Sequence, residues 1–595
     1  MKKRLLSLFL AIATLAGFSS CGKGSAKTNS TSAADYNMTL TLWLPTSEDT
    51  TEESIALVEA AINEITKKAY NTAIDITAIP EDEYDEAIKN KVLAVEEAEN
   101  LRLEEEQSRK KTERDAKKKG ETLPPRETET AAPSTFINED GQVEQFYPEA
   151  GENQLDIFCI RGYDNFAFFA DNAYLAPLDE SLAASSKLLK SYVFSSLLEY
   201  AKIPGDTSTY AIPNNHVVGE YTYLLVNKRL CEALKYDISE FTVDGLTALD
   251  SEICTQFITD IGMLKDNKST AIKGIENVDP LLDFYYDPNV LFWNGDGDTS
   301  KFSVIASYSQ DTDEPDKNRE GIGSVFNDSS MKRFLSTMTM MKSMQDKGYI
   351  AKDPSKSTEF GVGLVSCSNI EIAEYTDEYH AIVIKNPRVD NDDVFQSMFG
   401  VSMYSLDVDR SMEIVTAINT DPTIRTILQY GVEGIHWDYN EDLTENGEQT
   451  IKFLDKSSTY KMNLVDTGNV FMTYPGENLP ISNWEMGKAQ NRDSRINPFL
   501  GFSGYMDEKT TEAFEKIDKF SEEMLAKIND MTAEEFEGQL KYQAPGSNKK
   551  KNVLDSKVKA ENAYADITEP TDSESLVFKW VAFWDETYGK NLTQV

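Results

Sequence analysis

Aromatic and planar polar residues stand at three points where the sequence predicts that a buried strand ends. Aromatic rings stack on the apolar face of a pyranose, and carboxylate, amide and guanidinium groups bridge its hydroxyls. Open parallel sheets place ligands beyond the carboxyl ends of their strands, so we expect these side chains to face one carbohydrate, with the arginine on the rim. They are Trp43, Arg161, Tyr163, Asp164, Asn214 and Asn215.

Four more aromatic residues are candidate stacking platforms for the same ligand. Trp293 and Trp437 each stand beside Asp or Asn residues that could bond sugar hydroxyls. For every candidate the alternative is a ring that packs in a core or between lobes, and Trp484, in a helix-like stretch, is expected to be structural. The four candidates are Tyr221, Trp293, Trp437 and Tyr439.

The residue pattern gives little support to other chemistry. Asn294, Asp296 and Asp298 have the alternating oxygen spacing of a calcium loop, but its twelfth position is Ile305, where that loop needs Glu. The three His and five Cys residues show no metal-ligand spacing, and isolated buried thiols are the favoured state of the cysteines after Cys21. No P-loop, dinucleotide loop or nucleophile with a base appears, so we predict no metal, no cofactor and no enzymatic activity.

The first residues have the pattern of a secretory signal. Three basic residues precede the apolar run Leu5–Phe18, which is shorter than the roughly 20 residues of a spanning helix. Ser19-Ser20-Cys21 resembles a bacterial lipobox, although Phe18 stands where Leu is usual. We expect a signal peptide at 1–20, lipidation of Cys21, a flexible tether at 21–36 and a place on the extracytoplasmic face of the cell membrane. An ordinary cleaved signal is the alternative.

Length and charge limit the classes of partner. The chain has 595 residues, enough for two or more domains, and a formal charge of −42 that falls by three more when the basic signal is removed. Such an acidic surface repels nucleic acid and disfavours broad contact with anionic lipid. The lipid anchor is therefore the expected link to the membrane.

The chain opens with a strand, a helix and a second strand. Asn37–Pro45 and Ala73–Ile79 read as strands, and the apolar spacing of Glu53–Tyr70 predicts an amphipathic helix between them. Strand, helix and strand in this order predict a parallel sheet with a right-handed crossover. Later segments predict further strands at Leu155–Ile160, Tyr210–Pro213, Tyr223–Lys228 and His380–Ile384, and helices at Met331–Gly348, Arg410–Asn419, Thr423–Gly431 and Thr511–Met531.

A charged segment interrupts this pattern. Glu83–Lys119 begins amphipathic and becomes almost purely charged after Val95, with acidic residues four to five positions before basic ones. We interpret it as a long solvated helix followed by a Pro/Thr/Glu-rich loop at 120–151. A coiled coil that binds a partner is the alternative, but the apolar seam fades after Val95.

Several motifs together resemble the extracellular solute-binding proteins of bacterial ABC importers. Asp156-Ile157-Phe158 followed by Asn172–Asp179, and Tyr210–Pro213 followed by Tyr223–Lys228, are similar to paired runs of that family. Thr420–Gly434 and Gly468–Tyr474 resemble late segments of its large, oligosaccharide-associated lipoprotein branch. The resemblance covers most of Met38 to Asp507 and leaves out the charged segment at 96–151.

The resemblance implies a fold class and a domain order. It implies two α/β lobes of the periplasmic-binding-protein type (type II), with parallel-rich sheets, flanking helices and hinge crossovers. Lobe one would comprise 37–202, with the insertion at 96–151, and return for 384–434. Lobe two would comprise 203–381, and 435–595 would belong mainly to it.

The same resemblance implies the function. A monomeric, tethered protein would capture a carbohydrate, expected to be an oligosaccharide, between its lobes and deliver it to the permease subunits of an ABC importer. A non-transport surface glycan-binding or sensor protein of the same fold, and a binder of peptide or another small solute, remain alternatives. A glycan-cleaving enzyme is a more distant one, because no carboxylate pair can be placed.

Overall fold

The computed structural model describes residues 36–119, 135–137, 143–184, 186–203, 206–241, 249, 251–285, 290–293, 304–307, 328–441, 444, 447–496, 519, 523, 526–543 and 550–552. Cys21, the calcium-like motif at 294–298 and most of the helix expected at Thr511–Met531 lie outside these residues. The chain divides into two compact units, which we describe separately: Met1–His216 with Asp392–Glu485, and Val217–Asn391 with Met486–Val595.

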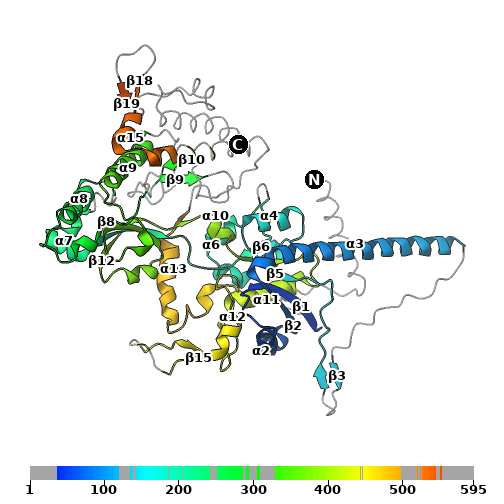
Figure 1. The fold of residues 1–595 in the computed structure, drawn as a ribbon. Helices are drawn as coiled ribbons and strands as arrows, with labels where there is room; N and C mark the ends of the chain where they lie inside the picture. Colours follow the sequence, from blue (N-terminus) through cyan, green and yellow to red (C-terminus); the bar gives the residue numbers. More distant parts are fainter. Residues whose placement is uncertain are drawn as a thin grey trace. The chain divides into compact units, whose positions relative to one another are not determined.

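Unit 1 is built on a five-stranded mixed sheet in the order β2-β1-β5-β14-β6 (Figure 1). β1 (Met38–Thr46) pairs in parallel with β2 (Thr72–Pro80) and with β5 (Ile157–Ile160), which confirms the expected parallel opening. β14 (Met398–Val401) lies antiparallel between β5 and β6 (Ala211–Pro213). Every residue of β1 except Trp43 is buried, as expected of a strand covered on both faces.

Two helices, α2 and α3, lie in the first two connections between strands of this sheet. α2 (Glu52–Tyr70) begins at Thr51, whose side chain accepts the N–H of Ser54, and it buries Val58 and Ile62. α3 (Glu81–Lys119) buries Tyr84, Ile88, Val92 and Val95 and then continues beyond the sheet (Figure 1). The long helix expected at 83–119 is therefore confirmed.

The chain reverses direction in the sheet after β2. β1 leads to β2 on one side, and the next sheet strand, β5, lies on the other side of β1. Right-handed crossovers in opposite directions put their helices on opposite faces, and ligands bind where the direction reverses. The switch point between β1 and β5 is thus the place in unit 1 where a site is expected.

Unit 1 also contains further helices and two separate two-stranded sheets. These elements are β3 (Thr135–Ile137), which pairs with β4 (Val143–Gln145), α4 (Tyr163–Asp171), α5 (Asp179–Ala183), α6 (Ser195–Tyr200), α10 (Asn391–Phe395), α11 (Val408–Thr420), α12 (Pro422–Tyr430), and β15 (Trp437–Tyr439), which pairs with β16 (Ile451–Phe453). α10 begins at the boundary between the units.

Unit 2 has a four-stranded sheet in the order β12-β7-β11-β8. β7 (Tyr221–Asn227) is antiparallel to β11 (Phe360–Cys367) and β12 (Tyr379–Lys385), while β8 (Asp279–Leu281) is parallel to β11. A core that includes Phe241 and Phe257 packs on the sheet. The other elements are α7 (Lys228–Leu234), α8 (Glu252–Asp266), β9 (Val290–Trp293), β10 (Val304–Ser307), α9 (Asp328–Asp346), β13 (Arg388–Val389), α13 (Trp484–Asp493), β17 (Arg495–Ile496), α15 (Ala533–Gln539), β18 (Lys541–Gln543) and β19 (Lys550–Asn552).

The unit boundaries differ from the expected lobes at three places. Residues 203–216 belong to unit 1 because β6 pairs with β14. Residues 384–391 belong to unit 2 because β12 runs to Lys385 and β13 pairs with β17. Residues 435–485, expected in the second lobe, belong to unit 1 because their loops bond to the segment after β1.

The insertion is also shorter than expected. β3 and β4 form a hairpin inside the segment interpreted as a loop. Asn37 Nδ2 donates to the Phe146 carbonyl at 3.0 Å, and Tyr147 Oη donates to the Lys67 carbonyl at 3.1 Å. The chain has therefore rejoined unit 1 by residue 146, before the expected end at 151.

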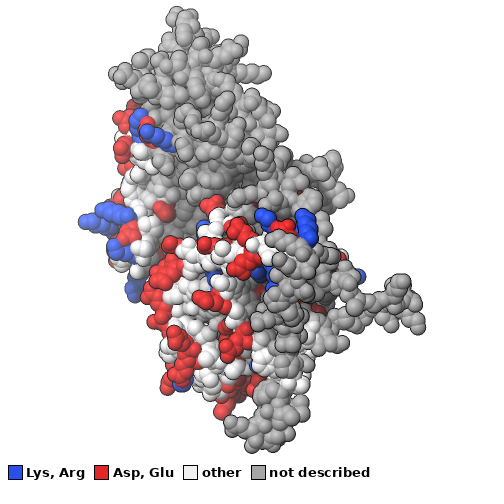
Figure 2. Space-filling model, turned by 90° about the vertical axis from the view of Figure 1, so that its right-hand side faces the viewer, with Lys and Arg blue, Asp and Glu red and all other residues white. Residues whose placement is uncertain are grey.

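Acidic side chains are more frequent than basic ones on one described face. Among the described residues visible in Figure 2, Asp and Glu are scattered over the surface, and Lys and Arg are fewer. This agrees with the net charge of −42. Among the described residues no helix is both long and apolar enough to cross a bilayer.

Candidate functional site

The first turn of α3 closes the switch point between β1 and β5. Tyr84 is fully buried, and its hydroxyl lies 3.0 Å from the Trp43 carbonyl of β1 and 2.9 Å from the Cys159 carbonyl of β5. Burial, together with the neighbouring Cys159, raises the pKa of this phenol well above its usual value. Tyr84 is thus a neutral donor that joins the two strands at their carboxyl ends.

Four further polar groups meet beside Tyr84, and we call Tyr84, Cys159, Asn214, Ser397 and Asp466 the strand-end cluster. Cys159 Sγ lies 3.3 Å from Ser397 Oγ and 3.9 Å from Asp466 Oδ1. Asn214 Nδ2 donates to Ser397 Oγ at 3.1 Å and to the Val465 carbonyl at 2.8 Å. Segments far apart in sequence therefore converge at one edge of the sheet.

Asp466 is the electrostatic centre of this cluster. Its side chain is 1% exposed, and Oδ2 has no hydrogen-bond partner among the described residues. Burial raises the pKa of this carboxyl to about 6, while the hydrogen bond from Ser397 and the charge of Arg161 oppose the rise. Asn214 Oδ1 is a second buried acceptor without a partner in the described chain. The cluster therefore has an excess of acceptors.

Arg425 holds the loop that carries Asp466. Its fully buried guanidinium donates from Nε to the Asn469 carbonyl at 3.0 Å and from Nη2 to the Leu464 carbonyl at 2.6 Å. Nη1 bonds Gln429 Oε1 at 3.2 Å, and no carboxylate bonds to the guanidinium in the part of the chain described. Burial consequently lowers the Arg425 pKa to about 9. Its bonds to backbone carbonyls on both sides of Asp466 fix the position of the carboxylate.

Arg161 follows β5 and pairs with α3. Its Nη2 lies 3.2 Å from Asp85 Oδ1 and 2.7 Å from the Glu81 carbonyl, and the guanidinium lies 5.6 Å from the centre of the Tyr84 ring. These contacts place Arg161 beside the first turn of α3, over the switch point. They also leave it half-buried rather than free in solvent.

Tyr163 and Asp164 lie in the first turn of α4, directly beyond β5. Gly162 precedes them with φ 77°, a left-handed conformation that favours glycine, and its N–H donates to the Phe395 carbonyl at 2.7 Å. Tyr163 packs edge-on against Phe395 with ring centres 5.0 Å apart, and it remains partly exposed. Asp164 is exposed. This turn offers an aromatic ring and a carboxylate at an accessible strand end.

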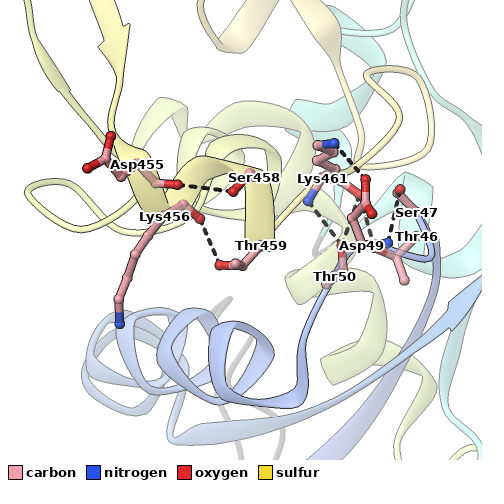
Figure 3. A network of polar contacts seen from close by, with 9 residues as sticks. All are labelled: Thr46, Ser47, Asp49, Thr50, Asp455, Lys456, Ser458, Thr459 and Lys461. Carbon is pink, nitrogen blue, oxygen red and sulfur yellow. Dashed lines mark hydrogen bonds and ion pairs between the residues drawn. The ribbon is translucent and has the colours of Figure 1, made fainter.

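The carboxyl end of β1 is occupied by another part of unit 1, as Figure 3 shows. The Lys461 carbonyl accepts hydrogen bonds from the Ser47 N–H at 3.1 Å and from Thr46 Oγ1 at 3.0 Å. Lys461 Nζ pairs with Asp49 Oδ2 at 2.7 Å. Around this contact, Thr50 and the 3-10 turn Asp455–Thr459 complete a polar network. The segment 455–461 thus covers the loop where the sequence predicts an open ligand-binding end.

Trp43 and the two asparagines have structural contacts in this conformation. Trp43 is partly buried, and Lys91 Nζ of α3 lies 5.4 Å from the centre of its ring. Asn215 accepts the Phe194 N–H at 3.0 Å and donates to the Tyr192 carbonyl at 2.8 Å. Asn214 is fully buried within the strand-end cluster. These three side chains do not present a common open face with Tyr163 and Asp164.

The other predicted platforms are dispersed. Trp437 is 4% exposed and donates its indole N–H to the Gly431 carbonyl at 2.9 Å, so its ring is a core residue that cannot stack on a ligand in this conformation. Tyr439 packs edge-on against it and is partly exposed. Tyr221 is buried in the sheet of unit 2, and Trp293 is the last residue of β9, where its side chain is not described. Trp484 is buried, with its N–H bonded to the Thr473 carbonyl.

Sequence reasoning missed Asp466, Tyr84 and Ser397. The signal for Asp466 was weak: it stands two residues before Gly468, where a segment singled out by the resemblance begins. Tyr84 lies near the start of a predicted helix and was not singled out, and Ser397 has no distinguishing neighbour in the sequence. Cys159, Cys231, Cys254 and Cys367 are buried free thiols, and the described residues contain no group of three or more His, Cys, Asp or Glu suited to a metal.

Comparisons with known proteins identify the fold. No family model matches the chain. A carbohydrate ABC transporter substrate-binding protein of Streptococcus pneumoniae serotype 4 (strain ATCC BAA-334 / TIGR4) is 28% identical over 194 residues, which are 30% of this chain and 38% of that relative. The match thus spans well under half of either protein.

Solved structures cover far more of the chain. The N-glycan transport solute binding protein NgtS from Streptococcus pneumoniae is 16% identical, with a TM-score of 0.51 over 93% of this chain and 100% of that one. An extracellular solute-binding protein from Bifidobacterium longum subsp. infantis is 12% identical, with a TM-score of 0.43 over 94% and 100%. The chain therefore shares the fold of NgtS over most of its length, and 194 of its residues are similar in sequence to part of a carbohydrate ABC transporter substrate-binding protein.

Proposed function

We propose that this chain is a tethered extracellular solute-binding protein that captures an oligosaccharide and delivers it to the permease of an ABC importer. The Streptococcus pneumoniae protein that matches in sequence is a carbohydrate ABC transporter substrate-binding protein, and NgtS, with the same fold, is named for N-glycan transport. Both are binding proteins, so we infer that this chain binds its sugar without cleaving it.

The observation that carries the proposal is the side-chain chemistry at the switch point of unit 1. Tyr163 offers a partly exposed ring, Asp164 an exposed carboxylate, and Arg161 a guanidinium over the same edge. A sugar needs this combination, because its C–H face stacks on the ring while its hydroxyls bond the charged groups. We assign Tyr163 and Asp164 the principal contacts and Arg161 the rim.

The remaining sequence predictions complete the proposal. Lipidation of Cys21 would hold the mature chain at the extracytoplasmic face of the membrane, where an importer collects its substrate. We propose that the chain acts as a monomer.

Isothermal titration of the chain from Gly22 onward tests the function. N-glycan oligosaccharides are the first probes, and maltooligosaccharides and short peptides are the comparison ligands. We expect saturable binding of at least one oligosaccharide and no release of reducing sugar. Binding of peptide alone, or reducing-sugar release at a steady rate, would reject the proposal.

A further inference from the structure

The last three turns of α3 form a basic segment in an acidic protein. Arg109–Lys119, which we call the basic tip, contains seven basic and two acidic residues, whereas the whole chain carries −42. Glu99–Glu106, just before it, contains four acidic residues and one basic residue. The positive charge is therefore concentrated at the far end of the helix.

The helix presents this segment away from the sheet of unit 1. The contacts of α3 with the sheet side of the unit end near Val95 and Glu96, which accepts a hydrogen bond from Tyr174. Every side chain from Arg109 to Asp115 is exposed, whereas Ala116 is buried. At 1.5 Å per residue, Lys119 lies about 36 Å along the helix from Val95. Figure 1 shows α3 continuing well past β1 and β2.

Pairs within the helix neutralise only part of the charge. Arg109 pairs with Glu113 at 3.3 Å, and Lys110 pairs with Glu106 at 2.7 Å. Lys111 and Arg114 have no ion pair within the described part of the chain. Exposed charges are screened over about 8 Å at physiological ionic strength, so the acidic body, several such lengths away, does not cancel the field of the tip.

We propose that the basic tip binds the anionic headgroups of the bilayer to which the chain is tethered. Each Lys or Arg near an anionic surface contributes favourably, and a cluster of four to eight is typical of such contacts. The expected tether at 21–36 keeps the tip close to that surface, which raises its effective concentration there. The contact is independent of sugar binding and adds a second attachment to the lipid at Cys21.

Vesicle sedimentation with the non-lipidated chain from Gly22 onward tests this contact. The tip variant replaces Lys111, Arg114, Lys117 and Lys118 by Gln. The control variant replaces four exposed lysines elsewhere, Lys187, Lys190, Lys273 and Lys352, and so has the same net charge. Vesicles contain phosphatidylcholine alone or with about 30% phosphatidylglycerol.

We expect the chain to partition onto the phosphatidylglycerol vesicles, and the tip variant to lose about tenfold or more of that partitioning while the control variant stays within about twofold. Raising the salt should release the chain. Equal losses in both variants, or no preference for the anionic vesicles, would overturn the proposal. Salt-sensitive self-association without vesicles that is lost only in the tip variant would identify a second copy of the chain as the partner instead, and would also overturn it.

Discussion

Replacing Asp466 by Asn should stabilise unit 1 at neutral pH. The substitution keeps the shape of the side chain but removes a negative charge that is buried in the strand-end cluster with one oxygen unpartnered among the described residues. The folded-state pKa is raised from 3.8 to about 6, mainly by burial. A shift of about two pKa units corresponds to roughly 3 kcal/mol between the two protonation states.

The sign of the pH dependence follows from that shift. Because the folded state holds the proton more tightly than the unfolded state, the stabilising contribution of Asp466 is complete below about pH 3.8 and is lost as the pH rises through about 6. At pH 7.5 the wild-type chain therefore carries the full penalty, and Asp466→Asn removes up to about 3 kcal/mol of it. In the variant the hydrogen bond from Ser397 no longer has a charged acceptor, and this offsets about 1 kcal/mol of the expected gain in stability.

Urea unfolding of the chain from Gly22 onward at pH 7.5 and pH 4.5 measures the effect. The transition of unit 1 can be followed by hydrogen exchange of β1 and β5 peptides, because two units need not unfold together. Glu64→Gln, on the exposed face of α2, is the matched control and should change neither transition. A destabilised Asp466→Asn chain at pH 7.5, or a gain equal at both pH values, would refute the reasoning.

Four further predictions test the sugar-binding residues, the core of unit 1, the lipid anchor and the charged insertion. Tyr163→Ala and Asp164→Ala should each weaken sugar binding about tenfold to a hundredfold in isothermal titration, with unchanged melting; wild-type affinity in both would place the site elsewhere. Arg425→Met should destabilise unit 1 by about 3 kcal/mol in urea, because three acceptors lose their donor, and an unchanged midpoint would contradict its role. Cys21→Ser should release the chain from membranes into the medium, whereas retention after a salt wash would reject lipidation. Replacing 100–142 with a Gly-Ser linker should leave sugar affinity within about twofold by titration. A large loss of affinity, with the fold intact by circular dichroism, would show that this segment contributes to the sugar site.

Much of the local structure could be predicted from the sequence. The helical spacing of apolar residues in 53–70 predicts α2 almost to its ends. The charged continuation of 83–119 predicts a solvated helix, and α3 has that form. These signals are local, because periodicity depends on residues within a few positions of one another.

The candidate site was only partly predictable for the opposite reason. The sequence predicts that residues after β5 reach a strand end, and Arg161, Tyr163 and Asp164 do lie there. It could not indicate that Trp437 donates to the Gly431 carbonyl inside the core, or that 455–461 covers the end of β1. Those contacts depend on where distant segments pack.

By itself the sequence determined the order of the elements, the parallel opening of the sheet, the charge of the surface and the family resemblance. Tertiary structure alone decided the boundaries of the units and the neighbours of the switch point. β14 joins the sheet of unit 1 between β5 and β6 although more than two hundred residues separate it from β5. Asp466 then reaches Cys159 because Arg425 bonds the carbonyls on both sides of it. Burial and pairing across such sequence distances arise only when the whole unit packs, since no local pattern encodes them.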